Sequence, residues 1–182
     1  VVAIRVRGAV GVDLFFVLSG FLIGGIMLKN IDIGRSHFSD LIHFLKRRWL
    51  RTLPNYLLIL ILNILVVLFV DGELPRRVGC YFIFTQNFVG GHPSFFSEAW
   101  SLSVEEYAYL LAPFFLYFSY YLFNNRNQKK LFFRVTLFLI MVLIIPKVHY
   151  YFNAQIYSYQ DWSHSFRKVV IYRLDAVYLG FY

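Results

Sequence analysis

The sequence predicts an all-α, polytopic transmembrane helical bundle. Of its 182 residues, 59% are hydrophobic and 21% are aromatic, whereas soluble domains contain roughly 45–50% apolar residues. The apolar residues form long blocks, several of them close to the ~20 residues that a helix needs to cross a bilayer. Lys and Arg residues fall in short stretches between the blocks. This distribution is typical of membrane topology and argues against nucleic-acid binding, although the formal net charge is +8.

We expect a single membrane domain over residues 1–182 that is part of a longer one, because the chain begins at Val1 rather than at Met. A piece from Val78 to Phe88 has about half the length of a span, and we expect a short or re-entrant helix there. A truncated span is expected from Val169 to Tyr182. The four complete spans are expected at Leu14–Leu28, Leu53–Val70, Val104–Phe123 and Leu131–Pro146.

The basic residues predict the orientation of these spans. The loop after the first span and the loop after the third are both rich in Lys and Arg, so the positive-inside rule makes both cytoplasmic. Residues 71–103 and 147–168 then lie on the far side of the membrane. The basic residues are Lys29, Arg35, Lys46, Arg47, Arg48 and Arg51 in the first loop, and Arg126, Lys129, Lys130 and Arg134 in the second.

The stretch RRWLRTLP places Arg47, Arg48 and Arg51 at the entrance of the second span. If it is helical, these residues are three or four positions apart and project as a cluster of planar donors suited to phosphate. The alternative interpretation is a positive-inside anchor with no binding role.

Polar residues inside the first and third spans are candidates for function or for packing. Asp13 opens the first and Ser19 lies near its middle, where Gly20 and Gly24 have the spacing that allows close approach of another helix. At the head of the third, Ser103 and Glu106 form a capping-box pattern, which gives Glu106 a structural role. Glu105 has no such role and is expected to point into the bundle, where an ionisable group is costly.

Four segments in this order resemble the acyltransferase 3 family. They are GVDLFFVLSGFLI (Gly11–Ile23), RRWLRTLPNYLLIL (Arg47–Leu60), WSLSVEEYAYLLAP (Trp100–Pro113) and YRLDAVYLGFY (Tyr172–Tyr182). The resemblance implies a polytopic membrane enzyme that moves an acyl group, usually acetyl, from acyl-CoA to a hydroxyl of a bacterial surface carbohydrate, such as lipopolysaccharide. It implies no metal. The chain covers about the first half of the family's usual membrane domain.

The resemblance also suggests roles for individual residues. Arg47, Arg48 and Arg51 would bind the phosphates of acyl-CoA from the cytoplasm. On the opposite side, Glu105 would orient the acceptor hydroxyl or a catalytic histidine, and Trp100 would stack on a sugar ring. Arg173 and Asp175 match a further family motif, for which we expect a buried structural ion pair.

The family's catalytic histidine has no counterpart among the histidines of this chain and is expected upstream of Val1. We therefore expect these residues alone to be inactive in acyl transfer.

A transporter or lipid-carrier flippase is the alternative function. Asp13, Glu105, Arg173 and Asp175 would then form an intramembrane path for ions or protons.

Overall fold

The computed structural model describes residues 2–32, 38–123, 127–154 and 158–182. Every regular element in these ranges is helical, which confirms the all-α prediction. The basic residues Arg35 and Arg126 of the two predicted loops lie outside the described ranges. The elements are α1 (Val2–Asp32), α2 (Phe38–Asp71), α3 (Val78–Phe82), α4 (Ala99–Phe123), α5 (Gln128–Asn153), α6 (Tyr159–Trp162), η1 (Ser163–Arg167), η2 (Val170–Tyr172) and α7 (Leu174–Leu179).

Three of the described helices are long and apolar enough to cross a membrane. The qualifying segments are Val10–Asn30 of α1, Ile42–Asp71 of α2 and Lys129–Asn153 of α5. The fourth predicted span forms α4, which has 25 residues but is not among these three; it carries Glu105, Glu106 and several Ser and Tyr residues. The four expected spans thus correspond to four long helices.

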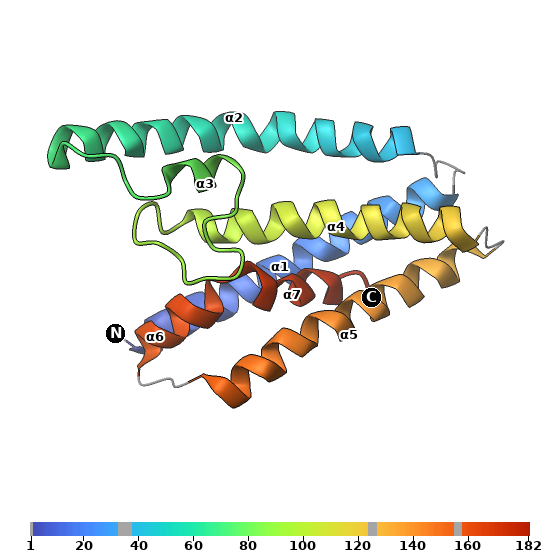
Figure 1. The fold of residues 1–182 in the computed structure, drawn as a ribbon. Coiled ribbons are helices and arrows are strands. Elements are labelled where there is room, and N and C mark those ends of the chain that lie inside the picture. The colour runs from blue at the N-terminus through green and yellow to red at the C-terminus, as the bar shows by residue number, and fades with distance from the viewer. Residues whose placement is uncertain (1, 33–37, 124–126, 155–157) are drawn as a thin grey trace.

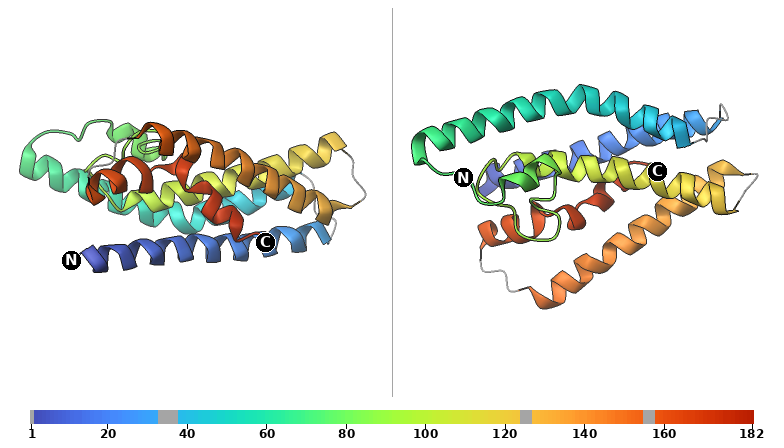
Figure 2. Two further views of the ribbon diagram at one scale, coloured as in Figure 1. Left: turned by 90° about the horizontal axis from the view of Figure 1, so that it is seen from below. Right: turned by 45° about the horizontal axis from the view of Figure 1, so that its top comes forward.

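Helix α4 lies at the centre of the bundle (Figures 1 and 2). It contacts α2 on one side and α5 and α7 on the other. Its residues Val104, Ala108 and Ala112 are almost completely buried, so small side chains allow neighbouring helices to approach it closely. Helix α4 is therefore the long helix that is best covered by the rest of the chain.

The two predicted basic loops lie at the same end of the bundle. In Figure 1 the end of α1, the start of α2, the end of α4 and the start of α5 all lie at the right, while α3 and α6 lie toward the opposite end. This arrangement agrees with the alternating topology that the charge distribution predicts. We call these two ends of the bundle the basic end and the α6 end.

The last segment of the chain, predicted as a truncated span from Val169, forms two short helices in the core. Val169, Val170, Val177 and Tyr178 are completely buried. Helix α7 lies between α1 and α5 (Figure 2). Its position makes the predicted RLDA motif part of the interior of the bundle.

Glycines allow α1 and α7 to approach closely, as the spacing of Gly20 and Gly24 predicts. A Cβ atom at Gly20 would lie 1.8 Å from the carbonyl oxygen of Val177, and one at Gly180 would lie 2.0 Å from the carbonyl oxygen of Val17. Both contacts are with backbone atoms, which cannot move aside as a side chain can. Only glycine fits at these two positions without separating the helices.

We expect Gly20→Ala to destabilise the protein by about 1–3 kcal/mol, the usual cost of overpacking a close-packed interior. Gly25→Ala is the matched control, because a Cβ atom at Gly25 would meet no atom within 4 Å. The measurement is thermal unfolding of the full-length protein in detergent. Equal midpoints for the two variants would contradict the close contact between α1 and α7.

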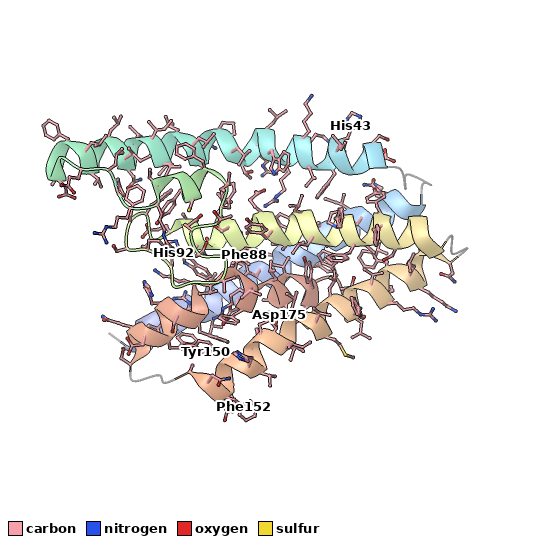
Figure 3. The ribbon with its side chains drawn as sticks, viewed as in Figure 1. His43, Phe88, His92, Tyr150, Phe152 and Asp175 are labelled. Carbon is pink, nitrogen blue, oxygen red and sulfur yellow. The ribbon has the colours of Figure 1, made fainter. Side chains whose placement is uncertain are left out.

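At the α6 end, the predicted short helix is confirmed as α3, which has only five residues. The loop that follows it contains Phe88 and His92 and lies beside the first turns of α4 (Figure 3). The His92 amide donates to the carbonyl oxygen of His164 in η1 at 3.4 Å. The Tyr56 hydroxyl donates to the carbonyl oxygen of Tyr81 at 2.8 Å, and the Asn87 side chain donates to that of Lys168 at 2.6 Å. These bonds tie α3 to α2 and the loop to the segment after η1.

His92 is buried inside this loop, with only 1% of its surface exposed. Its Nδ1 atom lies 2.6 Å from the carbonyl oxygen of Pro93 and donates to it, while Nε2 is buried without a partner among the described residues. Burial lowers the pKa of His92 from 6.5 to about 4, because a desolvated imidazolium is disfavoured. The folded protein therefore holds His92 neutral at pH values at which an exposed histidine is protonated.

We expect stability to fall on acidification because of His92. His92 takes up a proton near pH 6.5 in the unfolded chain but only near pH 4 in the folded chain. The stabilisation that neutral His92 contributes to the folded state is therefore fully present above pH 6.5 and is lost as the pH falls toward 4. A shift of this size corresponds to about 3 kcal/mol. Thermal unfolding at pH 7 and pH 5 should show a smaller loss for His92→Gln than for the wild type.

The control for this experiment is His149→Gln, which alters an exposed histidine. It should lose as much stability as the wild type between pH 7 and pH 5. If His92→Gln loses that much as well, the pH dependence does not come from His92.

Candidate active site

The structure brings two predicted functional groups into direct contact between α2 and α4. Nη2 of Arg48 lies 2.8 Å from Oε2 of Glu105 and donates a hydrogen bond to it. The side chains of Arg48 and Glu105 are 17% and 10% exposed. We predicted the arginines at the cytoplasmic face and Glu105 on the opposite side; this prediction is wrong, because the helices place Arg48 and Glu105 at the same depth.

The helical geometry of α2 explains why only Arg48 reaches α4. Successive residues of an α-helix are about 100° apart, so Arg47 and Arg51 share one face while Arg48 points roughly a quarter turn away. Arg47 and Arg51 are exposed, and neither forms an ion pair with any residue that the structure describes. The expected cluster of three guanidinium groups is therefore divided into one buried arginine and two exposed ones.

Glu106 also contacts α2, rather than capping α4 as we predicted. Helix α4 begins at Ala99, so Ser103 lies within its first turns, where its hydroxyl donates to the carbonyl oxygen of Ala99 at 3.1 Å. Oε2 of Glu106 accepts a hydrogen bond of 2.9 Å from the indole of Trp49. Oε1 of Glu106 lies 3.5 Å from the Thr52 hydroxyl, which donates to it, and 3.6 Å from Nε of Arg48.

Tyr109 connects this group of residues to α1. The guanidinium carbon of Arg48 lies 3.4 Å from the centre of the Tyr109 ring, a cation–π contact. The Tyr109 hydroxyl is hydrogen-bonded to the Ser19 hydroxyl. We call Ser19, Arg48, Glu105, Glu106 and Tyr109 the Arg48 site. It contains two carboxylates and one guanidinium, and it joins α1, α2 and α4.

A hollow of about 300 Å³ opens beside the Arg48 site. Glu106 contributes the only carboxylate to its lining within the described residues, and the other walls are largely aromatic or aliphatic, among them Trp49, Leu53 and Leu110. The site therefore combines fixed charges with an apolar space large enough for a short acyl group.

Trp100 is buried rather than open to a sugar. It is 6% exposed, and its ring meets Phe16 edge to face with the ring centres 5.8 Å apart. The guanidinium carbon of Arg167 lies 5.2 Å from the centre of the Trp100 ring. The surroundings of Trp100 are thus occupied by the chain itself, and a sugar cannot stack on the ring as we predicted.

The charged residues of the RLDA motif pair with other helices and not with each other. Nη1 of Arg173 lies 2.9 Å from Oδ1 of Asp13 on α1. Nζ of Lys147 on α5 lies 2.6 Å from Oδ2 of Asp175, which lies in the middle of the bundle (Figure 3). We expected one ion pair within the motif; the two residues instead link α7 to α1 and to α5.

Three residues of these networks were missed by sequence reasoning. Tyr109 lies four positions after Glu105, so helical spacing was sufficient to place both on one face of α4. Trp49 lies between Arg48 and Arg51, and its local sequence does not indicate Glu106 as the acceptor for its indole. Lys147 follows Pro146 at the end of a span, and nothing in its local sequence indicates Asp175 as its partner.

Comparisons with known proteins agree with the resemblance noted from the motifs. The family described as "Acyltransferase domain" matches residues 2–182. Nothing among the solved structures matches the chain.

Three bacterial relatives illustrate the similarity. O-acetyltransferase OatA of Staphylococcus aureus is 27% identical over 170 residues, which cover 85% of this chain and 28% of that protein. A putative peptidoglycan O-acetyltransferase, YrhL of Bacillus subtilis, is 37% identical over 139 residues, covering 66% and 21%. Peptidoglycan O-acetyltransferase OatA of Listeria monocytogenes is 31% identical over 124 residues, covering 60% and 20%.

The matched parts of this chain thus span about a fifth to just over a quarter of the length of these relatives. The family match itself extends over nearly the whole chain and includes every helix described above. The chain belongs to the acyltransferase family that this domain defines.

Proposed function

We propose that the protein transfers an acetyl group from acetyl-CoA to a hydroxyl of a cell-surface carbohydrate at the plasma membrane. The observation that carries this proposal is the contact between Arg48 and Glu105, because a buried guanidinium and a buried carboxylate meet beside an apolar hollow. The names of the relatives suggest peptidoglycan as the acceptor. They give no support to lipopolysaccharide.

Arg47 and Arg51 are suited to contact the donor. Both are exposed on α2, toward the basic end of the bundle. Acyl-CoA is a polyanion, and guanidinium groups bind phosphate through paired, charge-assisted hydrogen bonds. In this proposal Arg47 and Arg51 hold the phosphates, while the hollow beside Glu106 receives the acyl end of the donor.

Arg48 and Glu105 act at the reacting groups. The acceptor hydroxyl attacks the thioester carbonyl, its proton passes to a general base, and coenzyme A leaves as the carbon–sulfur bond breaks. The Glu105 carboxylate accepts hydrogen bonds, so it suits orienting the hydroxyl or the protonated base. Arg48 donates a hydrogen bond to Glu105 and offers a cation near the developing oxyanion. The family resemblance implies that the base is a histidine upstream of Val1.

The transport alternative has less support from the contacts. Each of the residues that would form the path is engaged in an ion pair with another part of the bundle. These residues are Asp13, Glu105, Arg173 and Asp175. Pairs of this kind hold helices together, and breaking one costs about 3–5 kcal/mol because it leaves a buried charge without a partner.

We expect Arg48→Gln and Glu105→Gln each to reduce acetyl transfer by the full-length protein about 10²–10³-fold, the usual effect of removing a group that stabilises developing charge. Because the two side chains act together, the double variant should lose little more than either single one. Arg48→Lys should restore part of the activity, since it keeps the charge without the planar fork. Transfer is measured with radiolabelled acetyl-CoA and isolated cell wall.

The control for this series is Arg134→Gln, which removes an exposed charge from α5. It should transfer acetyl groups at the wild-type rate. If the loss of activity in the double variant equals the product of the two single losses, Arg48 and Glu105 act separately. If the single variants do not fold, the pair serves stability alone.

We expect Arg47→Gln and Arg51→Gln to raise the KM for acetyl-CoA about tenfold each, with little change in the KM for the carbohydrate, because each removes a charge-assisted contact to phosphate. The KM for the donor should also become less dependent on salt. If both constants stay unchanged while fewer molecules insert correctly into the membrane, Arg47 and Arg51 serve as a topological anchor.

A further inference from the structure

A second polar site lies at the α6 end of the bundle, away from the Arg48 site. It is a hollow of about 680 Å³ lined by residues of α6 and η1 and by Lys168. In Figure 1 this segment lies at the end opposite the basic end, where α2 and α5 begin. We call it the Arg167 hollow. By the predicted topology it faces the outside of the membrane.

The Arg167 hollow has an excess of positive charge. Arg167 and Lys168 line it, His164 adds an imidazole, and the one carboxylate in the described lining is Asp161. Oδ2 of Asp161 accepts a hydrogen bond of 2.8 Å from the Ser158 hydroxyl, so it is used within its own turn. The two cations are therefore balanced by at most one anion in the lining.

Arg167 lacks a partner that would satisfy its charge. Its Nε atom is buried and finds no hydrogen-bond acceptor among the described residues. Its guanidinium group lies over the Trp100 ring instead, while the nearby Arg173 pairs with Asp13. Arg167 is only partly exposed, and a partly buried cation without an anion is unfavourable, so a bound oxyanion would remove this cost.

The surroundings hold these cations in place. The carbonyl oxygen of Lys168 accepts a hydrogen bond of 2.6 Å from the Asn87 side chain, and that of Asn87 accepts one of 2.9 Å from the amide of Val170. A Cβ atom at Gly91 would lie 2.5 Å from Nδ1 of His164, so the loop packs closely against the lining. Lys168 is also close enough to the exposed Glu98 for this carboxylate to raise its pKa, although burial lowers the pKa more.

We propose that the Arg167 hollow binds an oxyanionic group of the carbohydrate acceptor. Arg167 and Lys168 would hold the oxygens, and Trp100 would position the Arg167 guanidinium. This inference rests on the proposed acyl transfer, to which it adds that the acceptor is an anionic carbohydrate. A carboxylate or a phosphate on the carbohydrate would satisfy the same contacts.

The experiment uses the full-length protein and soluble peptidoglycan oligosaccharides with free carboxylates, compared with the same oligosaccharides after amidation. The wild type should bind the free acids at least about tenfold more tightly, since charge-assisted hydrogen bonds are lost on amidation. In Arg167→Gln and Lys168→Gln this difference should shrink toward equal affinity. Lys130→Gln, which removes an exposed lysine at the basic end, should keep it.

Binding is measured by calorimetry in detergent without acetyl-CoA, so its outcome does not depend on turnover. If the wild type binds the acidic oligosaccharides selectively but transfers no acetyl group, the proposed function fails and the anion site stands. If transfer occurs while wild type and variants bind acidic and amidated oligosaccharides equally, the anion site is refuted. Loss of phosphatidylglycerol binding in the variants, with oligosaccharide selectivity unchanged, would assign the hollow to lipid and overturn the proposal.

Discussion

The buried guanidinium of Arg48, shared between the adjacent carboxylates of Glu105 and Glu106, determines how α2 and α4 fit together. Two neighbouring carboxylates inside a membrane protein are costly unless donors surround them. Arg48, Trp49 and Thr52 on α2 supply those donors within little more than one helical turn. The need of Glu105 and Glu106 for hydrogen-bond donors therefore explains why α2 is already helical in its basic stretch, before its apolar part begins.

Elsewhere in the bundle, two further ion pairs join segments that are far apart in the sequence. Arg173 of the segment before α7 is paired with Asp13 of α1, and Lys147 of α5 is paired with Asp175 of α7. Together with the glycine contacts between α1 and α7, these pairs fix the short α7 in the centre of the bundle. The Arg48 site and the RLDA motif thus lie on two faces of one rigid core built around α4.

Much of this fold could be predicted from local patterns, and the partners of the charges could not. Block length and hydrophobicity indicated four long helices, and the small residues Gly20 and Gly24 indicated a close helix contact. Glu105 was singled out correctly as a buried carboxylate, but its partner Arg48 is 57 residues away in the sequence, and no periodicity relates them. The error over Glu106 arose from helix length, since α4 begins four residues before Ser103.

The Arg167 hollow and the Arg48 site lie at different positions along α4, and these positions determine how an acceptor bound in the hollow could reach Glu105. Trp100, which contacts Arg167, is five residues before Glu105, and a helix rises 1.5 Å per residue, so the two positions are separated by about 7–8 Å along the axis. A sugar unit is of similar size. Successive residues also turn by about 100°, so Trp100 and Glu105 lie about 140° apart around α4, and an acceptor anchored by its oxyanion in the Arg167 hollow would have to extend around this helix to bring a hydroxyl to Glu105. This geometry gives the central position of α4 a reason beyond packing, because one rigid helix then sets the distance between the anchor and the reacting group.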